Sequence, residues 1–241
     1  MRQGMTEAIA GRSGSERAYR RLRDEILHGG VLPGDRLTAA DLRARYGLGL
    51  TPIREALTRL SAEGLVDAET HRGARVADVS AEGLADLMAT RRSIERLCIS
   101  AAIERGDAAW EARVVASMHV LARTPLPSDP GDRAAAAAWE KRHRDFHFAL
   151  VSACGSEWLL RFWGTLVDHS ERFRSLRLLH RHARAAKVRN VNAEHRAIMS
   201  AALDRDVAAA TSLMDRHLVA TESSVARLLA AGRDATQGEP R

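Results

Sequence analysis

Apolar residues recur at helical spacing over most of the chain, and the first clear case starts at Ser15. Leu22 and Ile26 fall on one face of residues 15–28, which predicts an amphipathic helix with Ser15 as its N-cap. Gly29 and the glycine after it are expected to end this helix. The pattern therefore places the first ordered element near the N-terminus.

Two shorter helices are expected next. Thr38 can cap a helix over 39–46, which Gly47 stops. The third helix is predicted to open on Thr51-Pro52, with the threonine as N-cap and the proline in the first position, where a missing N–H costs nothing. These helices, separated by a tight turn, have the layout of a helix-turn-helix.

Two short strands are predicted after the third helix, over residues 65–68 and 74–79. The segment Thr70-His71-Arg72-Gly73 turns the chain between them. Three helices followed by a small hairpin is the plan of a winged helix-turn-helix, in which the hairpin is the wing.

From residue 81 onward the pattern is helical, with no later strand signal. Helices are expected at 81–105, 107–123, 133–154, 156–178, 184–203 and 205–231. The predicted fold class is therefore mainly α, with an N-terminal winged helix-turn-helix over 15–79 and a C-terminal all-α bundle of about six helices over 80–231. Residues 1–14 and 232–241 lack periodicity and are expected to be disordered tails.

Composition adds little to this picture. The composition, with 45% apolar and 28% charged residues, is typical of a globular protein, and the net charge is +6. The basic residues are nearly all arginine, which suits phosphate contact but suits a GC-rich genome equally well. Cys98 and Cys154 have no metal or redox spacing and are expected to be free buried thiols. No apolar run approaches the roughly 18 residues of a membrane span, so a cytoplasmic location is expected, with no membrane partner.

Several arginines are placed to contact DNA. Arg54 lies on the exposed side of the third helix, where its guanidinium can reach a guanine edge or a phosphate. Thr51 and the backbone N–H groups of the helix start can hold a phosphate. Arg36, before the second helix, and Arg72, at the wing tip, are further candidates, and Gly73 would let the wing backbone approach a groove.

Four histidines stand out in the helical region. His143 and His147 are four residues apart on one helix face, with Cβ atoms roughly 5–6 Å apart, which makes a two-nitrogen metal platform. His195 and His217 lie on two later helices that a bundle can bring to the same interior point. From spacing alone the first pair suggests a metal site, and the other two remain ordinary helical histidines.

Residues 15–79 resemble the N-terminal domain of the GntR family of bacterial transcription regulators. The segments PGDRL, TPIREAL and RLSAEGLV carry this resemblance. It implies a winged helix that binds a short palindromic operator as a homodimer. It also implies DNA contact by Arg36, Thr51 and Arg54, and by the wing around Arg72 and Gly73.

Two positions depart from the family pattern. The family usually has Ser-Arg before Thr-Pro, whereas this chain has Gly49-Leu50, so Leu50 cannot repeat the base contact of that arginine. Either the operator differs, or base readout depends more on Arg54 and on apolar contact with a thymine methyl. Arg43 stands where alanine is common and is expected to add a phosphate contact.

Residues 81–231 resemble the FCD effector domain of the FadR subfamily. The matching segments are RRSIERLCISAA, HRDFHFAL, EHRAIMSAALDRD and MDRHL. In metal-binding members an aspartate and a histidine four residues apart, with two later histidines, hold a divalent metal. The resemblance implies His147, His195 and His217 as ligands, and His143 stands at the aspartate position.

We therefore expect His143 to be the fourth ligand. Asp145 is two residues off and would face about 160 degrees away on the helix. Four neutral imidazoles favour Zn, Ni or Cu over Mn, and of these we expect Zn, with Ni as the alternative. They also leave the metal's charge uncompensated, which would attract an anionic effector. Arg91 and Glu95 can form an ordinary helical ion pair. The resemblance adds that Arg91, with Arg92 next to it, faces the effector cavity and holds a carboxylate.

Three functions are compatible with these features. The first is a transcription repressor whose operator binding is modulated by a small carboxylic acid at the metal site. The second is a metal-dependent enzyme, which we disfavour because no carboxylate is expected on the His143–His147 face to act as general base. The third is a DNA-binding protein without an effector, in which the histidines are structural.

Overall fold

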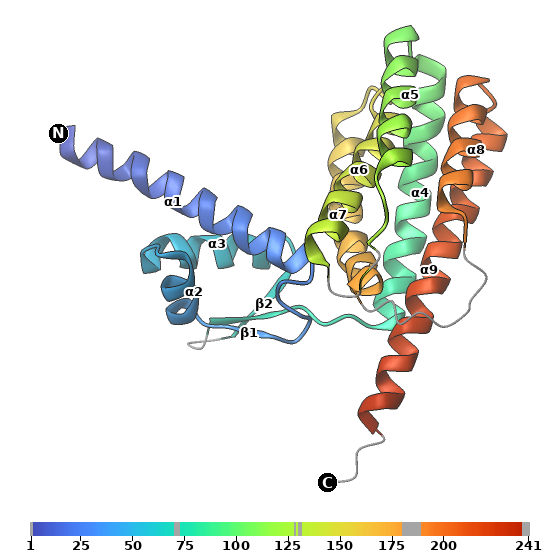
Figure 1. Cartoon of the computed structure of the whole chain (residues 1–241). Helices are drawn as coiled ribbons and strands as arrows, with labels where there is room; N and C mark the ends of the chain where they lie inside the picture. The colour runs from blue at the N-terminus through green and yellow to red at the C-terminus, as the bar shows by residue number, and fades with distance from the viewer. Residues whose placement is uncertain (1, 70–72, 128, 130–131, 180–188, 238–241) are drawn as a thin grey trace. The chain divides into compact units, whose positions relative to one another are not determined.

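The computed structural model describes residues 2–69, 73–127, 129, 132–179 and 189–237. The chain divides between Val79 and Ser80 into two compact units, each with its own buried side chains. The N-terminal unit is mixed α and β, and the C-terminal unit is all α (Figure 1). The mainly α fold class expected from the sequence is confirmed.

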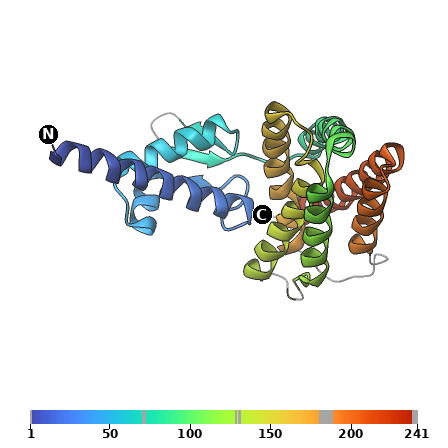
Figure 2. The ribbon, with the colours of Figure 1, turned by 90° about the horizontal axis from the view of Figure 1, so that it is seen from above.

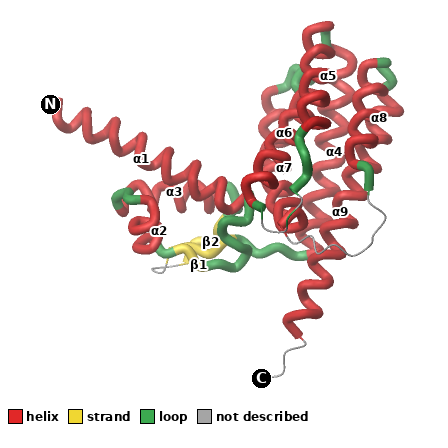
Figure 3. Tube along the Cα trace, in the orientation of Figure 1, coloured by secondary structure: helices red, strands yellow, loops and turns green. Residues whose placement is uncertain are grey.

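The N-terminal unit is a winged helix-turn-helix. Its helices are α1 (Arg2–Leu27), α2 (Ala39–Tyr46) and α3 (Leu50–Ala62), and its strands are β1 (Arg36–Leu37), β2 (Val66–Glu69) and β3 (Gly73–Val76). The strands form an antiparallel sheet in the order β1-β3-β2, shown in yellow in Figure 3. Helix α3 packs against α1, α2 and β2. The exposed face of α3 and the wing strands thus belong to one small rigid body.

The core of this unit joins the three helices to the sheet. Leu22 and Ile26 of α1, Ile53 and Leu60 of α3, and Val76 of β3 are all almost completely buried. Each such aliphatic side chain contributes roughly 1.5–3 kcal/mol by leaving water. The apolar residues that recur at helical spacing in the sequence are therefore the residues that form this core.

Helix ends differ in how well the sequence predicted them. Thr38 caps α2, because its hydroxyl accepts from the Asp41 N–H at 3.1 Å, and Gly47 ends the helix in the left-handed conformation. The predicted cap at Thr51 is wrong. Helix α3 starts at Leu50 with Gly49 as its N-cap and no side-chain cap hydrogen bond, so Thr51 lies inside the first turn.

Other bounds also differ from the expectations. Helix α1 begins at Arg2, so the segment 1–14 predicted as a tail is helical from that residue, and Ser15 is not an N-cap. Helix α9 extends to Gln237, past the predicted tail start at 232. Strand β1 was not predicted, because two residues carry too little pattern. The predicted turn residues at 70–72 lie outside the described part of the chain.

The wing requires a glycine where β3 begins, for a reason the sequence did not reveal. Gly73 has a φ of +100°, and a Cβ at this position would lie 2.3 Å from the backbone oxygen of Leu37. Any side chain would therefore push β1 away from β3. The backbone of Gly73 therefore lies closely against β1, and its expected approach to a DNA groove stays a prediction.

The C-terminal unit is a helical bundle. Its described residues form α4 (Ala81–Arg105), α5 (Ala108–Arg123), α6 (Arg133–Val151), α7 (Glu157–Leu179), α8 (Val191–Leu203) and α9 (Val207–Gln237). Figure 2 shows these helices gathered together when seen from above. Helix α8 starts at Val191 rather than at the predicted 184, and residues 184–188 of that prediction lie outside the described residues. The other predicted helices are present.

Helix α4 is the central element of this bundle. It packs against α6, α7 and α9, while α5 lies on α6 and α8, and α8 lies on α9. Trp110 of α5 is completely buried, and its indole N–H donates to the Ala149 carbonyl of α6 at 2.9 Å. Cys98 and Cys154 are free and buried, as expected. Among the described residues, no helix combines the length and the apolar character needed to cross a bilayer.

The corrected start of α3 leads to a test with a matched pair of threonines. Thr38→Ala removes the hydrogen bond by which the Thr38 hydroxyl caps α2. The loss should lower the local stability of α2 by about 0.5–2 kcal/mol. Thr51→Ala removes no cap and should change the stability of α3 by less than about 0.5 kcal/mol. Amide hydrogen exchange reports both helices in the full chain. Equal losses of protection in the two helices would contradict the observed caps.

Candidate functional site

Four histidines converge in the interior of the C-terminal unit. His143 and His147 come from α6, His195 from α8 and His217 from α9, and all four side chains are buried. One nitrogen atom from each lies within 4.8 Å of the corresponding atoms of the other three. The structure therefore brings together all four histidines singled out in the sequence.

The spacing of the two α6 histidines fits a shared metal ion. Their Nε2 atoms are 3.2 Å apart. Two nitrogens bound to one tetrahedral zinc ion at about 2.0–2.1 Å would lie about 3.3 Å apart. Neither ring nitrogen of His195 is hydrogen-bonded to another of the described residues, although its side chain is buried. A buried polar atom without a partner costs free energy, and a metal ion would satisfy it.

The surroundings of the four rings lower the pKa of each, which favours the neutral form whose lone pair can bind a metal. Burial, together with neighbouring histidines and arginines, keeps the pKa values of His143, His147 and His195 well below the usual range. Burial also lowers the pKa of His217, although its hydrogen bond to Glu194 opposes this. Two aromatic rings pack against the histidine cluster: Trp139 stacks on His143, and Phe146 contacts His195.

Three glutamates lie behind the histidines, on the side of their Nδ1 atoms. Glu140 Oε2 is 3.8 Å from His143 Nδ1, and Glu95 Oε1 is 3.6 Å from His147 Nδ1. Glu194 Oε2 is within 2.9 Å of His217 Nδ1. The expectation that no carboxylate lies near the His143–His147 face is therefore wrong. Glu140 was readable from its position three residues before His143, whereas Glu95 lies on another helix.

These glutamates lie next to Nδ1 atoms, away from the Nε2–Nε2 contact of His143 and His147, and each is bound to an arginine. Arg91 Nε donates to Glu95 at 3.3 Å, and Arg174 Nη2 donates to Glu140 at 3.0 Å. Arg189 donates to both oxygens of Glu194. These hydrogen bonds and the one from His217 outweigh burial and lower the pKa of Glu194 to about 2, so this group is a carboxylate. Glutamates engaged in this way are poorly placed to act as general bases on a metal-bound ligand.

The two arginines proposed to bind an effector lie in different surroundings. Arg91 is 1% exposed and close to the cluster, where its Nη1 also donates to Ser170 Oγ at 2.6 Å. Arg92 pairs instead with Asp215 and Glu222 of α9. It lines a separate groove between α4 and α9 that contains none of the cluster histidines. The structure therefore places Arg91 but not Arg92 beside the histidines.

Asp145 does not join the cluster. Its side chain is 42% exposed and pairs with Lys141 and Arg142 on the outer face of α6. The position two residues after His143 thus points away from the interior, as the helical period requires.

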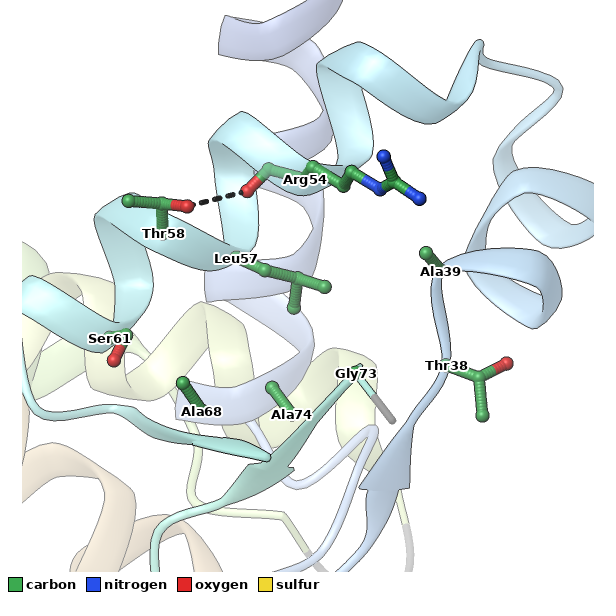
Figure 4. A pocket seen from close by; sticks show the side chains of 9 residues that line it. All are labelled: Thr38, Ala39, Arg54, Leu57, Thr58, Ser61, Ala68, Gly73 and Ala74. Carbon is green, nitrogen blue, oxygen red and sulfur yellow. Dashed lines mark hydrogen bonds between the residues drawn. The ribbon is translucent and has the colours of Figure 1, made fainter. Parts of the chain in front are cut away.

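The N-terminal unit has a hollow between α3 and the wing (Figure 4). The Arg54 side chain extends from α3 across its mouth toward Ala39, at the start of α2. The hydroxyl of Thr58, one turn later, donates a hydrogen bond to the Arg54 carbonyl at 3.0 Å. A second shallow hollow lies along the outer face of α3, and Thr51 and Arg54 line it too. Arg54 thus borders both hollows of the exposed α3 face.

The other DNA-contact candidates surround this face. Arg43 of α2 and Thr51 of α3 are exposed. Leu50 is 39% exposed at the start of α3, where the family has its arginine. Arg36 on β1 is exposed but pairs with Glu69 of β2 at 3.5 Å, and Glu69 also binds Arg75. Gly73 begins β3, and Arg72 lies outside the described residues.

Comparison with known proteins decides the family. Residues 14–76 match the pattern of bacterial regulatory proteins of the gntR family, and residues 86–220 match the FCD domain. The chain belongs to the GntR family. It is a DNA-binding transcription regulator with an FCD domain, and not an enzyme.

Relatives of this GntR-family regulator match over most of their length. The HTH-type transcriptional regulator BphR of Paraburkholderia xenovorans (strain LB400) is 38% identical, over 89% of this chain and 84% of BphR. The HTH-type transcriptional repressor GlaR of Escherichia coli (strain K12) is 36% identical, over 83% of this chain and 90% of GlaR.

Solved structures agree on the fold. Escherichia coli McbR/YncC superimposes with a TM-score of 0.74 at 17% identity, covering 89% of this chain and 98% of that protein. A GntR regulator from Rhodococcus sp. RHA1 gives a TM-score of 0.68 at 22% identity, over 88% and 97% of the two chains. FCD domains bind metals, and the buried histidine cluster is the group in this chain suited to that role.

Proposed function

We propose that this regulator is a repressor whose operator binding is controlled by a metal ion and a small carboxylic acid in the FCD domain. One observation carries the proposal, which is that four buried imidazoles meet at one point. DNA binding by the first unit does not need such a cluster, so we assign the cluster to sensing by the second unit. The relative GlaR is a repressor, and we extend that role to this chain.

The metal we propose is Zn, with Ni as the second choice. All-imidazole ligation by His143, His147, His195 and His217 suits these ions better than Mn. The three glutamates and the three arginines that bind them cancel in charge, so the ion's double positive charge is not offset nearby. The metal would act as a Lewis acid that holds an anionic effector group.

The effector we propose is a small carboxylate that contacts the metal and Arg91. The Nε and Nη1 atoms of Arg91 bind Glu95 and Ser170, and we assign its Nη2 amino group to the ligand. Binding would shift the helices that carry the ligands, and so alter the spacing of the two DNA-binding units in a homodimer. An effector has this effect only if it binds the two arrangements with unequal affinity.

On the DNA side, we propose that α3 enters the major groove of a palindromic operator. Arg54 would reach base edges or phosphate, with Leu50 in apolar contact with a thymine methyl. Thr51, Arg36 and Arg43 would contact phosphates, together with the wing around Arg72 and Gly73. Arg36 forms an ion pair with Glu69, so a contact between Arg36 and a phosphate requires this pair to open or to turn outward.

The ligand set can be tested by elemental analysis with a matched pair on α6. Purified protein should contain about one Zn or Ni per chain. His143→Ala should lose most of that metal, because it removes one of four ligands, whereas Asp145→Ala should retain it, because Asp145 faces solvent. Metal-free wild-type protein would contradict the site, and full metal content in His143→Ala would contradict the fourth ligand.

The role of Arg54 can be tested on DNA from upstream of the protein's own gene. Arg54→Ala should weaken binding by roughly 1–3 kcal/mol and relax the preference for specific over random sequence. Arg113→Ala removes the same charge from the exposed side of α5 and should leave operator affinity within a factor of two or so. Gel shift titrations measure both, and the proposal fails if the two variants bind alike.

Effector binding can be tested by thermal shift on the Zn-loaded full chain. A panel of small carboxylic acids should include a ligand that stabilises the protein, by about 2.7 kcal/mol at a hundredfold excess over its Kd. Arg91→Lys keeps the charge but loses the planar donor, and it should abolish that shift. Arg92→Ala lies in the other groove and should preserve it. A ligand whose shift depends on Arg92 instead would overturn the assignment.

A further inference from the structure

A repeated arrangement surrounds the histidine cluster. Three of the four histidines have an Nδ1 atom next to a glutamate, and each of these glutamates binds an arginine. The three sets are His143–Glu140–Arg174, His147–Glu95–Arg91 and His217–Glu194–Arg189. We call Glu95, Glu140 and Glu194, with their arginines, the outer pairs.

We propose that the three glutamates of the outer pairs are positioning residues for the metal ligands. Each accepts the Nδ1–H of its histidine, which fixes the tautomer whose Nε2 lone pair points to the centre of the cluster. Metal-bound histidines commonly donate their second ring N–H to a carboxylate in this way. This inference rests on the metal site proposed above, and it assigns roles to residues outside the ligand set.

Distances and burial support this role. The His217 contact is already a hydrogen bond, at 2.9 Å from Nδ1 to Glu194 Oε2. The other two contacts, at 3.6 and 3.8 Å, lie just beyond hydrogen-bond length. Glu95 and Glu140 are fully buried, and Glu95 Oε1 and the Nδ1 atoms of His143 and His147 have no other hydrogen-bond partner. A small rotation of each ring toward a central metal would leave these groups paired with each other.

The arginines explain why the glutamates stay in place. Arg174 contacts both oxygens of Glu140, at 3.0 to 3.3 Å. Ser170 of α7 accepts from both Arg91 and Arg174, at 2.6 and 3.1 Å, so two outer pairs are joined on one helix. Arg189 also donates to the His217 carbonyl at 2.8 Å and to Thr221 at 3.0 Å. Each glutamate is thus held by an arginine as well as by its histidine, and at the third set Arg189 Nη2 also lies 3.0 Å from His217 Nδ1, so Glu194 and Arg189 both contact that nitrogen.

The charge of the outer pairs sharpens this inference. A glutamate alone behind each imidazole would add negative charge to the site, but each is matched by an arginine within 3.3 Å. The outer pairs can therefore orient the ligands without reducing the positive charge of the metal. His195 has no such partner among the described residues, so its ring is the one whose orientation the metal itself must set.

Competition with a chromogenic chelator tests this in the full chain, with Zn²⁺ as the probe. Glu194→Gln and Glu140→Gln should each weaken Zn²⁺ binding by about tenfold to a hundredfold, because an amide is a weaker acceptor for the Nδ1–H. Glu111→Gln breaks an ion pair with Arg205 that involves none of the cluster residues, and it should bind Zn²⁺ as the wild type does.

Two further readouts separate positioning from a general loss of structure. Melting of the metal-free proteins should be similar for Glu194→Gln and Glu111→Gln, since both side chains are about one-third exposed. Imidazole ¹⁵N NMR of the Zn-loaded wild type should show Nδ1 protonated and Nε2 bound at His217, and this tautomer should be less populated in Glu194→Gln. Because Glu140 is fully buried, Glu140→Gln should also lower the melting temperature of the metal-free protein, so Glu194→Gln decides the outcome.

The outcomes distinguish the two proposals. If the wild type binds no Zn²⁺, the metal site of the proposed function is wrong. If the wild type binds Zn²⁺ tightly and Glu194→Gln binds it as tightly as Glu111→Gln, the metal site stands and the positioning role is overturned.

Discussion

Burying four imidazole rings at one point is the constraint on which the C-terminal unit depends. Each ring brings two nitrogen atoms that need hydrogen-bond or metal partners, and away from water these must come from the protein or from a bound ion. The bundle supplies glutamates for the Nδ1 atoms of His143, His147 and His217. The Nε2 atoms of His143 and His147 contact each other, and His195 Nε2 has no hydrogen-bond partner among the described residues. A bound metal ion, as we propose, would give these nitrogens a partner.

That arrangement gives the bundle its internal connections. The ligands come from α6, α8 and α9, and the glutamates and arginines behind them bring in α4 and α7. An ion that draws the four nitrogens together would therefore act on five helices at once. Ligand binding could in this way change how the helices pack. Arg91 would link the two events, because it binds Glu95 of the outer pairs and, as we propose, the effector. A helical framework that changes in this way is the kind of two-state element that a regulator needs.

The sequence predicted the elements better than the contacts between them. Strong helical periodicity placed most helices, and Thr38 was read correctly as a cap because its geometry is local. Thr51 was misread because the helix start depends on the backbone at Gly49, which no side chain marks. Spacing on one helix found His143 and His147, and a family resemblance was needed to add His195 and His217. Glu95 and the arginines behind the glutamates come from other helices, so their roles depend on tertiary packing. Arg92 was assigned to the effector only by its place beside Arg91, and helix rotation sends it to another groove.

The central claim is that four imidazoles of one chain bind one metal ion. X-ray absorption at the metal edge of the purified, fully loaded protein tests this most directly. The account predicts a first shell with four imidazole nitrogens at about 2.0–2.1 Å, with their outer ring atoms visible by multiple scattering, whether or not an oxygen ligand is added. A shell with fewer than four imidazoles, or protein that carries no metal, would contradict it.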